Sequence, residues 1–110
     1  MNLREARVTF SSLIGRVIEK AQELGLEAAY DEVTNHQGKG HMTGSLHYFG
    51  CAGDILLYKN GTYLTGSEDY RVLGEYWESL HPFCKWGGSF KNADGNHFSF
   101  SPPEVFGDRA

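Results

Sequence analysis

The chain has 110 residues, of which 40 % are hydrophobic and 22 % are charged, and its formal net charge is −4. That length suits one domain with a single modest core, and the negative charge argues against general affinity for nucleic acid or an anionic membrane. No apolar stretch approaches the ~20 residues that span a bilayer. The N-terminal MNLREARVTF also lacks the basic segment and apolar core of a secretion signal.

We therefore expect a single domain over residues 1–110 that does not insert into a membrane. We also expect this domain to be a monomer. Cys51 and Cys84 are too few for a disulfide framework. Both are expected to be buried, reduced thiols in a chain that folds in cytoplasm. The glycine and alanine that flank Cys51 favour tight packing over a role as ligand or nucleophile.

The first half of the chain predicts a helix, a short strand and a loop. Residues 9–24 carry apolar side chains at helical spacing, and Gly25 follows the run. The stretch LEAAYDEV (26–33) alternates weakly, which favours a short strand. TNHQGKGHMTG (34–44) is polar and glycine-rich without periodicity, so a loop is expected there.

The second half predicts a hairpin, a helix and two further strands. Within DILLYKNGTYLT (54–65), two β-prone runs flank Asn60-Gly61, a pair that accepts the positive φ angles of a tight turn. Ser67 is expected to cap the next helix. The closing segment, 84–103, favours two short strands joined by a turn. Together these elements predict an α+β domain, a small antiparallel sheet with flanking helices.

Two of the five histidines stand close to aspartates in segments that are expected to be ordered. His47 precedes Asp54 by seven residues, and His97 follows Asp94 by three. Two imidazoles and one carboxylate suit a catalytic zinc ion with an open position for water, and a second carboxylate can accept the proton of that water. The residues alone leave other interpretations open. The histidines can be ordinary surface or core residues, and Asp94 with Gly95 forms a good hairpin turn without any catalytic role.

Two motifs resemble peptidase family M15, the zinc-dependent peptidoglycan peptidases of the D-alanyl-D-alanine carboxypeptidase type. SLHYFGCAGD (45–54) resembles the family's Ser-X-His-X-X-Gly-X-Ala-X-Asp signature. WGGSFKNADGNHF (86–98) resembles its Trp-Gly-Gly-X-Phe…Asp-X-X-His-Phe motif. The segment between the motifs, 56–82, looks like the small single-domain bacteriophage members. The resemblance covers residues 40 to 100 and implies a Hedgehog/DD-peptidase-like fold.

Carried over position by position, the resemblance makes His47, Asp54 and His97 the zinc ligands and Asp94 the general base. It also explains why Asp54 stands at the start of an apolar strand. A bound cation would offset the several kcal/mol that burial of the Asp54 charge costs. Ser45 is expected near the substrate, and Trp86 is expected to form a wall of the substrate site. The implied partner is a peptidoglycan peptide.

One feature of many relatives is missing. They carry an arginine upstream of the first motif that helps to hold the substrate or the developing oxyanion, whereas this chain has TNHQ (34–37) there. His36, Lys39 and His41 are candidates to replace its charge. The difference bears on turnover and on bond specificity rather than on metal binding.

The resulting hypothesis is a zinc peptidase that cuts the stem or crosslink of peptidoglycan. We expect a phage or prophage endolysin that stays in the host cytoplasm until a pore protein releases it to the cell wall. Two alternatives stay open: a non-catalytic zinc module that binds wall peptides, and a virion component for local wall penetration. A carboxylate such as Asp94 beside the ligands argues against the first alternative.

Overall fold

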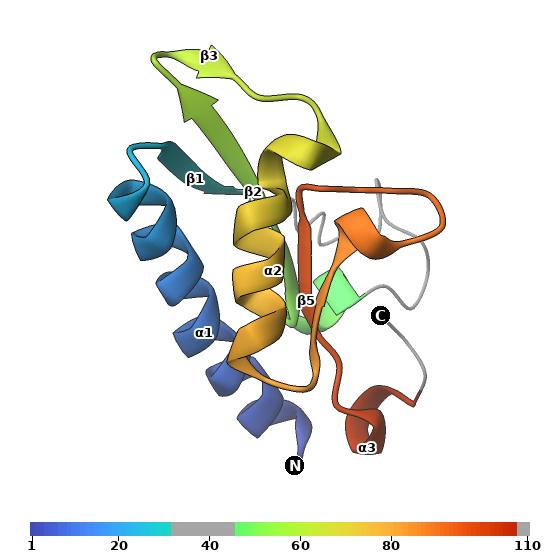
Figure 1. The fold of residues 1–110 in the computed structure, drawn as a ribbon. Helices are drawn as coiled ribbons and strands as arrows, with labels where there is room; N and C mark the ends of the chain where they lie inside the picture. The colour runs from blue at the N-terminus through green and yellow to red at the C-terminus, as the bar shows by residue number, and fades with distance from the viewer. Residues whose placement is uncertain (32–45, 108–110) are drawn as a thin grey trace.

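The structure is a computed structural model that describes residues 1–31 and 46–107, without the side chains of His47 and Tyr48. Figure 1 shows the fold. Its elements follow in the order α1 (Leu3–Glu23), β1 (Glu27–Asp31), the 3₁₀ helix η1 (Leu46–Phe49), β2 (Ala52–Lys59), β3 (Thr62–Tyr63), the 3₁₀ helix η2 (Ser67–Tyr70), α2 (Arg71–Leu80), β4 (Cys84–Trp86), the 3₁₀ helix η3 (Gly87–Ser89), β5 (His97–Phe100) and α3 (Pro103–Phe106).

The described strands form one antiparallel sheet in the order β1-β2-β5-β4, and β3 pairs with the C-terminal end of β2. β2 is the central strand, because it pairs with β1, β3 and β5. Alternate side chains of a strand point to opposite faces of the sheet. Ile55 and Leu57 of β2 are therefore buried on one face, while Asp54 points to the other.

Helices α1 and α2 pack side by side against the face of the sheet that carries Ile55 (Figure 1). Trp77 of α2 joins these layers: its ring meets Phe10 of α1 at 5.8 Å and Phe98 of β5 at 6.1 Å, centroid to centroid. The indole Nε1 donates to the backbone oxygens of Lys85 and Ser99, each at 3.1 Å. Because every polar atom of the indole is satisfied, this large side chain can be fully buried at low cost.

Helix α1 begins earlier than the apolar spacing predicted. Asn2 Oδ1 accepts a hydrogen bond from the Glu5 backbone N–H, and Glu5 Oε1 accepts one from the Asn2 backbone N–H, both at 2.8 Å. This reciprocal pair is a capping box. The signal was present in the sequence as Asn-X-X-Glu, whereas the prediction used only the apolar repeat.

The prediction that Ser67 caps a helix is wrong. The cap position is Gly66, whose N–H donates to Asp69 Oδ2 at 3.1 Å, and Ser67 itself lies in η2. The Ser67 hydroxyl instead accepts a hydrogen bond from a distant backbone N–H, that of Gly95. A local sequence rule could not show this use of the side chain, since its partner Gly95 lies in the turn before β5, 28 residues away in sequence.

The strand predicted within 26–33 is present as β1, and the loop predicted over 34–44 lies outside the described residues. Asn60 and Gly61 adopt φ angles of 50° and 78° between β2 and β3, as the hairpin required. The segment 84–103 holds β4 and β5, and the predicted α+β class with an antiparallel sheet and flanking helices is confirmed. The short helix α3 was not predicted. Among the helices that the structure describes, none is long and apolar enough to cross a membrane.

Candidate metal and catalytic site

Asp54 of β2 and His97 of β5 lie directly opposite each other in the antiparallel ladder. Side chains at such paired positions share one face of the sheet, with Cβ atoms about 4.5–5.5 Å apart. That face is the one turned away from α1 and α2. The structure therefore brings together two of the three predicted metal ligands, although many residues separate them in sequence.

The His97 side chain is buried, with 7 % of its surface exposed, and its Nε2 atom is also buried. Its ring meets that of Phe90 at 5.3 Å, centroid to centroid. The backbone of Gly87 approaches His97 closely. A Cβ atom added at Gly87 would lie 2.7 Å from the Cβ of His97, which is too close for any residue but glycine. The imidazole therefore packs against the Phe90 ring, while the close approach at the His97 Cβ leaves no room for a side chain at position 87.

A third ionisable side chain belongs to the same row. Asp31 of β1 pairs with Asp54 in register, so Asp31, Asp54 and His97 follow one another across three strands on one face. Like charges that lie directly opposite each other in a ladder destabilise the pairing unless other charges compensate them. The sequence analysis missed Asp31, because only the register between β1 and β2 places it beside Asp54.

Asp94 lies in the turn that leads into β5. Its backbone N–H donates to Gly87 O at 2.9 Å, and its backbone oxygen accepts from His97 N–H at 3.1 Å. The carboxylate is exposed. Asp94 and His97, the predicted base and the predicted ligand, therefore belong to one hydrogen-bonded turn.

Two of the predicted residues cannot be placed. His47 belongs to η1, which leads through Gly50 into β2, but its side chain lies outside the described part of the chain. Ser45 also lies outside the described residues, as do His36, Lys39 and His41, the candidates for the missing arginine.

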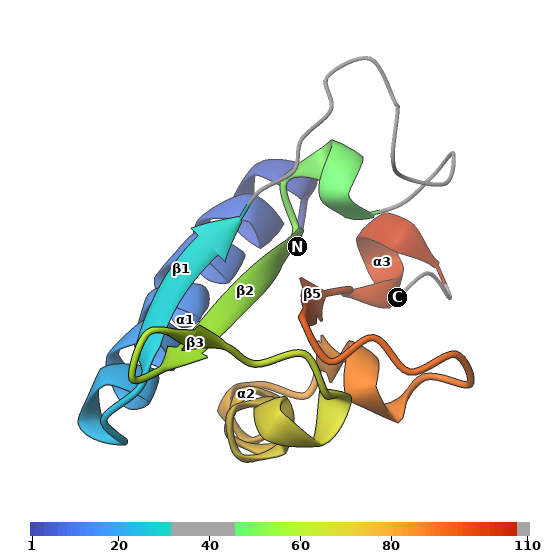
Figure 2. The ribbon, with the colours of Figure 1, turned by 90° about the horizontal axis from the view of Figure 1, so that it is seen from above.

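The aromatic rings of Phe49 in η1 and Phe106 in α3 lie 5.5 Å apart, centroid to centroid, and Figure 2 shows these two elements side by side.

The donor set fits zinc as far as the structure describes it. Within residues 1–31 and 46–107, no group of three His, Cys, Asp or Glu side chains is placed to hold a metal ion. Asp54 and His97 supply one oxygen and one nitrogen donor from adjacent strands, and zinc accepts both types in catalytic sites. The third ligand, His47, stays a prediction.

Trp86 is buried, with 1 % of its surface exposed. Its indole Nε1 donates to Gly95 O at 2.8 Å, and its backbone N–H donates to Glu78 Oε2 at 3.1 Å. The indole therefore lies behind the turn that carries Asp94. This position agrees with a wall of the site, and direct contact between Trp86 and a substrate stays a prediction.

The cysteines are free and buried, as predicted. Burial raises the pKa of Cys51 to about 11, which nearby Arg7 lowers only in part. Burial also raises the pKa of Cys84 to about 12, with a further contribution from Glu78. Both thiols are therefore protonated near neutral pH in the metal-free chain, which lowers their reactivity as nucleophiles.

We expect both thiols of the folded protein to react slowly with a disulfide reagent at about pH 8, and rapidly once guanidinium chloride unfolds the chain. Because each pKa in the fold stands above the ordinary value of 9.0, the neutral thiols stabilise the fold fully below that pH. This contribution is lost as the pH rises through the raised values. In a Cys51→Ala, Cys84→Ala double variant, the free energy of unfolding should therefore fall less as the pH rises above about 9 than it does in the wild type. Equal reactivity in folded and unfolded chains would contradict the burial.

Comparison with known proteins gives one family match. A family model described as D-alanyl-D-alanine carboxypeptidase matches residues 39–100. None of the curated proteins compared with the chain matches it. The matched range includes both motifs and runs from before η1 to the end of β5, so it contains the predicted metal ligands and Asp94.

Proposed function

The chain belongs to the M15 family of D-alanyl-D-alanine carboxypeptidases, and on that premise we propose that it is a zinc-dependent peptidase of the bacterial cell wall. The family is generally zinc-dependent, and its substrates are peptidoglycan peptides. In our proposal the enzyme hydrolyses a peptide bond in the stem or the crosslink. The observation that carries the proposal is the direct pairing of Asp54 with His97, next to the turn that holds Asp94.

In this proposal Asp54, His97 and His47 hold the zinc ion. When bound there, zinc would supply a water molecule of lowered pKa and would polarise the scissile carbonyl. Asp94 takes the proton from the attacking water and passes it to the departing amine, which is the work of a general base and then of a general acid. The exposed position of its carboxylate supports this role, because both the water and the substrate must reach it.

The remaining residues hold the reacting groups. Phe90 and Gly87 keep the His97 imidazole in one orientation, which reduces the freedom that metal binding would have to remove. Ser45 is proposed to contact the substrate peptide, and Trp86 is proposed to close the site behind the turn. A zinc module that only binds wall peptides has no need for an exposed carboxylate three residues from a ligand, so Asp94 favours catalysis.

We also assign the enzyme to a phage or prophage lysis system. In that role it leaves the host cytoplasm through a pore and cuts the wall in the periplasm. The likeness of residues 56–82 to small phage members supports this assignment. A gene position beside pore-forming lysis genes agrees with it, whereas a position among tail genes would indicate a virion component for wall penetration.

Digestion of purified muropeptides tests the activity. The zinc-loaded chain is expected to convert them to products that each differ by the addition of one water across a peptide bond, and mass spectrometry then identifies the bond. The candidates are the L-alanyl-D-glutamate bond, the D-alanyl-D-alanine bond and the D-alanyl crosslink to diaminopimelate. A chelator should abolish cleavage, and zinc should restore it while magnesium does not. Intact muropeptides after incubation with the zinc-loaded chain would contradict the proposal.

A further inference from the structure

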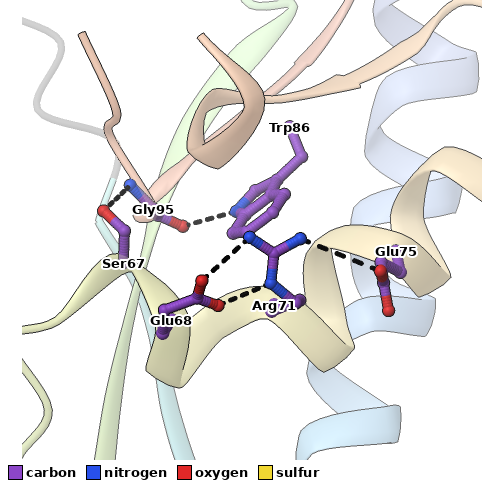
Figure 3. Close-up of polar contacts among 6 residues, drawn as sticks. All are labelled: Ser67, Glu68, Arg71, Glu75, Trp86 and Gly95. Carbon is purple, nitrogen blue, oxygen red and sulfur yellow. Dashed lines mark hydrogen bonds and ion pairs between the residues drawn. The ribbon is translucent and has the colours of Figure 1, made fainter. Parts of the chain in front are cut away.

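Gly95, the residue after Asp94, is hydrogen-bonded at both of its backbone polar atoms by side chains from other elements. Its N–H donates to Ser67 Oγ at 3.1 Å, and its oxygen accepts from Trp86 Nε1 at 2.8 Å. Figure 3 shows Ser67 and Trp86 on either side of Gly95. Side-chain groups therefore fix the plane of the peptide units that follow Asp94.

The fit between Gly95 and Ser67 is close. A Cβ at Gly95 would lie 2.6 Å from Ser67 Cα and 3.1 Å from Ser67 O, so the two backbones approach as only glycine allows. The Ser67 hydroxyl has no role as a helix cap, since Gly66 occupies that position. Its hydrogen bond to Gly95 spans 28 residues of sequence, which identifies a tertiary function for this side chain.

Trp86 is itself held firmly on the other side. Glu78 Oε2 accepts its backbone N–H at 3.1 Å, and the Arg71 guanidinium lies 5.4 Å from the centroid of its ring. Glu68 of η2 and Glu75 of α2 pair with Arg71 from either side, with Arg71 Nη2 donating to Glu68 Oε1 at 3.0 Å (Figure 3). The indole donor to Gly95 thus has little freedom to move away.

The rest of the turn is also hydrogen-bonded. Asn96 O accepts from Ile55 N–H of β2 at 2.9 Å, and Asn96 Nδ2 donates to Tyr63 Oη at 3.1 Å. Gly95 is the point between Asp94 and His97 at which the chain changes direction. A rotation of its peptide would move the Asp94 carboxylate relative to the His97 imidazole, and a displacement of about 1 Å can lower a rate by about a hundredfold.

We propose that Ser67 is a positioning residue, which together with Trp86 holds Gly95 and so sets the direction of Asp94 relative to His97. The inference rests on the proposed function for its catalytic consequence, whereas its structural part concerns the Gly95 amide alone. Trp86 then acts through the turn rather than by touching the substrate.

The test compares Ser67→Ala with Ser67→Thr, which keeps a hydroxyl, and with Ser11→Ala. Ser11 is a matched control because its exposed hydroxyl donates to Arg7 O at 2.9 Å within α1, a different element from those around Gly95. In the zinc-free protein, amide hydrogen exchange of Gly95 measured by NMR should become about 3- to 10-fold faster in Ser67→Ala, as the loss of one net hydrogen bond implies. The exchange rate should be restored in Ser67→Thr and unchanged in Ser11→Ala.

In the zinc-loaded protein, kcat on a muropeptide should fall about 10- to 100-fold in Ser67→Ala, the usual range for groups that orient a metal site. KM should stay close to that of the wild type, and Ser67→Thr should recover most of kcat. Unchanged Gly95 exchange, or an unchanged kcat per folded molecule, would overturn the inference. An inactive wild type would instead overturn the proposed function, and the exchange measurement would still decide whether Ser67 holds Gly95.

Discussion

Asp94→Asn is expected to lower the rate of muropeptide cleavage by about 10²- to 10⁴-fold, the range for loss of a general acid–base group. The amide has the size of the carboxylate but cannot accept a proton from water. Asp94 is exposed, so its replacement removes no buried contact and should leave the fold unchanged. Cleavage is measured by chromatography and mass spectrometry, and bound zinc is measured by elemental analysis on the same sample.

The zinc content separates a general base from a ligand. In our proposal Asp94→Asn keeps its metal, because Asp54, His97 and His47 are unchanged. Glu23→Gln is the matched control, since it neutralises an exposed carboxylate at the C-terminal end of α1, remote from the turn. Cleavage by Asp94→Asn at the rate of Glu23→Gln would remove Asp94 from its catalytic role, and loss of zinc would make it a ligand instead.

The second large effect concerns metal binding. His97→Ala should reduce bound zinc from about one ion per chain to almost none, because a catalytic zinc site has only three protein ligands. Activity on muropeptides should disappear with the metal. The measurement is elemental analysis after dialysis, together with circular dichroism to establish that the variant is folded.

His81→Ala is the control for the loss of a histidine. The His81 ring packs on Phe100 at 4.9 Å, centroid to centroid, and its Nδ1 accepts from Phe83 N–H at 3.1 Å. Its removal should cost about 1–2 kcal/mol of stability and leave the zinc content unchanged. Retention of zinc by His97→Ala would show that the metal site was assigned incorrectly.

Periodicity and spacing predicted much of this molecule. The apolar repeat over 9–24 identified the core face of α1, because helical geometry places those side chains on one side whatever they later contact. Asn60-Gly61 identified the hairpin through its tolerance of positive φ angles, and both residues adopt them. The two motifs predicted the family, which the match over residues 39–100 confirms. The same motifs named Asp54, His97 and Asp94 as site residues. Their roles as metal ligands and general base stay predictions.

Local rules failed where a side chain serves a distant partner. Ser67 is a residue type that commonly caps helices, yet its hydroxyl accepts from Gly95 N–H and Gly66 takes the cap position. Trp86 also has a distant partner, since its Nε1 donates to Gly95 O, while its expected place as a wall of the substrate site stays a prediction. The competing partner lies in another element in each case, and its proximity depends on how the elements pack.

By itself, the sequence determined which residue types the chain offers for zinc chemistry, which faces of its helices are apolar and where its turns can form, because these depend on neighbours along the chain. Only the tertiary structure decided that Asp31, Asp54 and His97 stand in one row and that Gly95 lies between Ser67 and Trp86. The alternation of a strand sets the face of each side chain but not its partner. That partner follows from the register of the ladder, which the packing of the whole sheet against α1 and α2 selects.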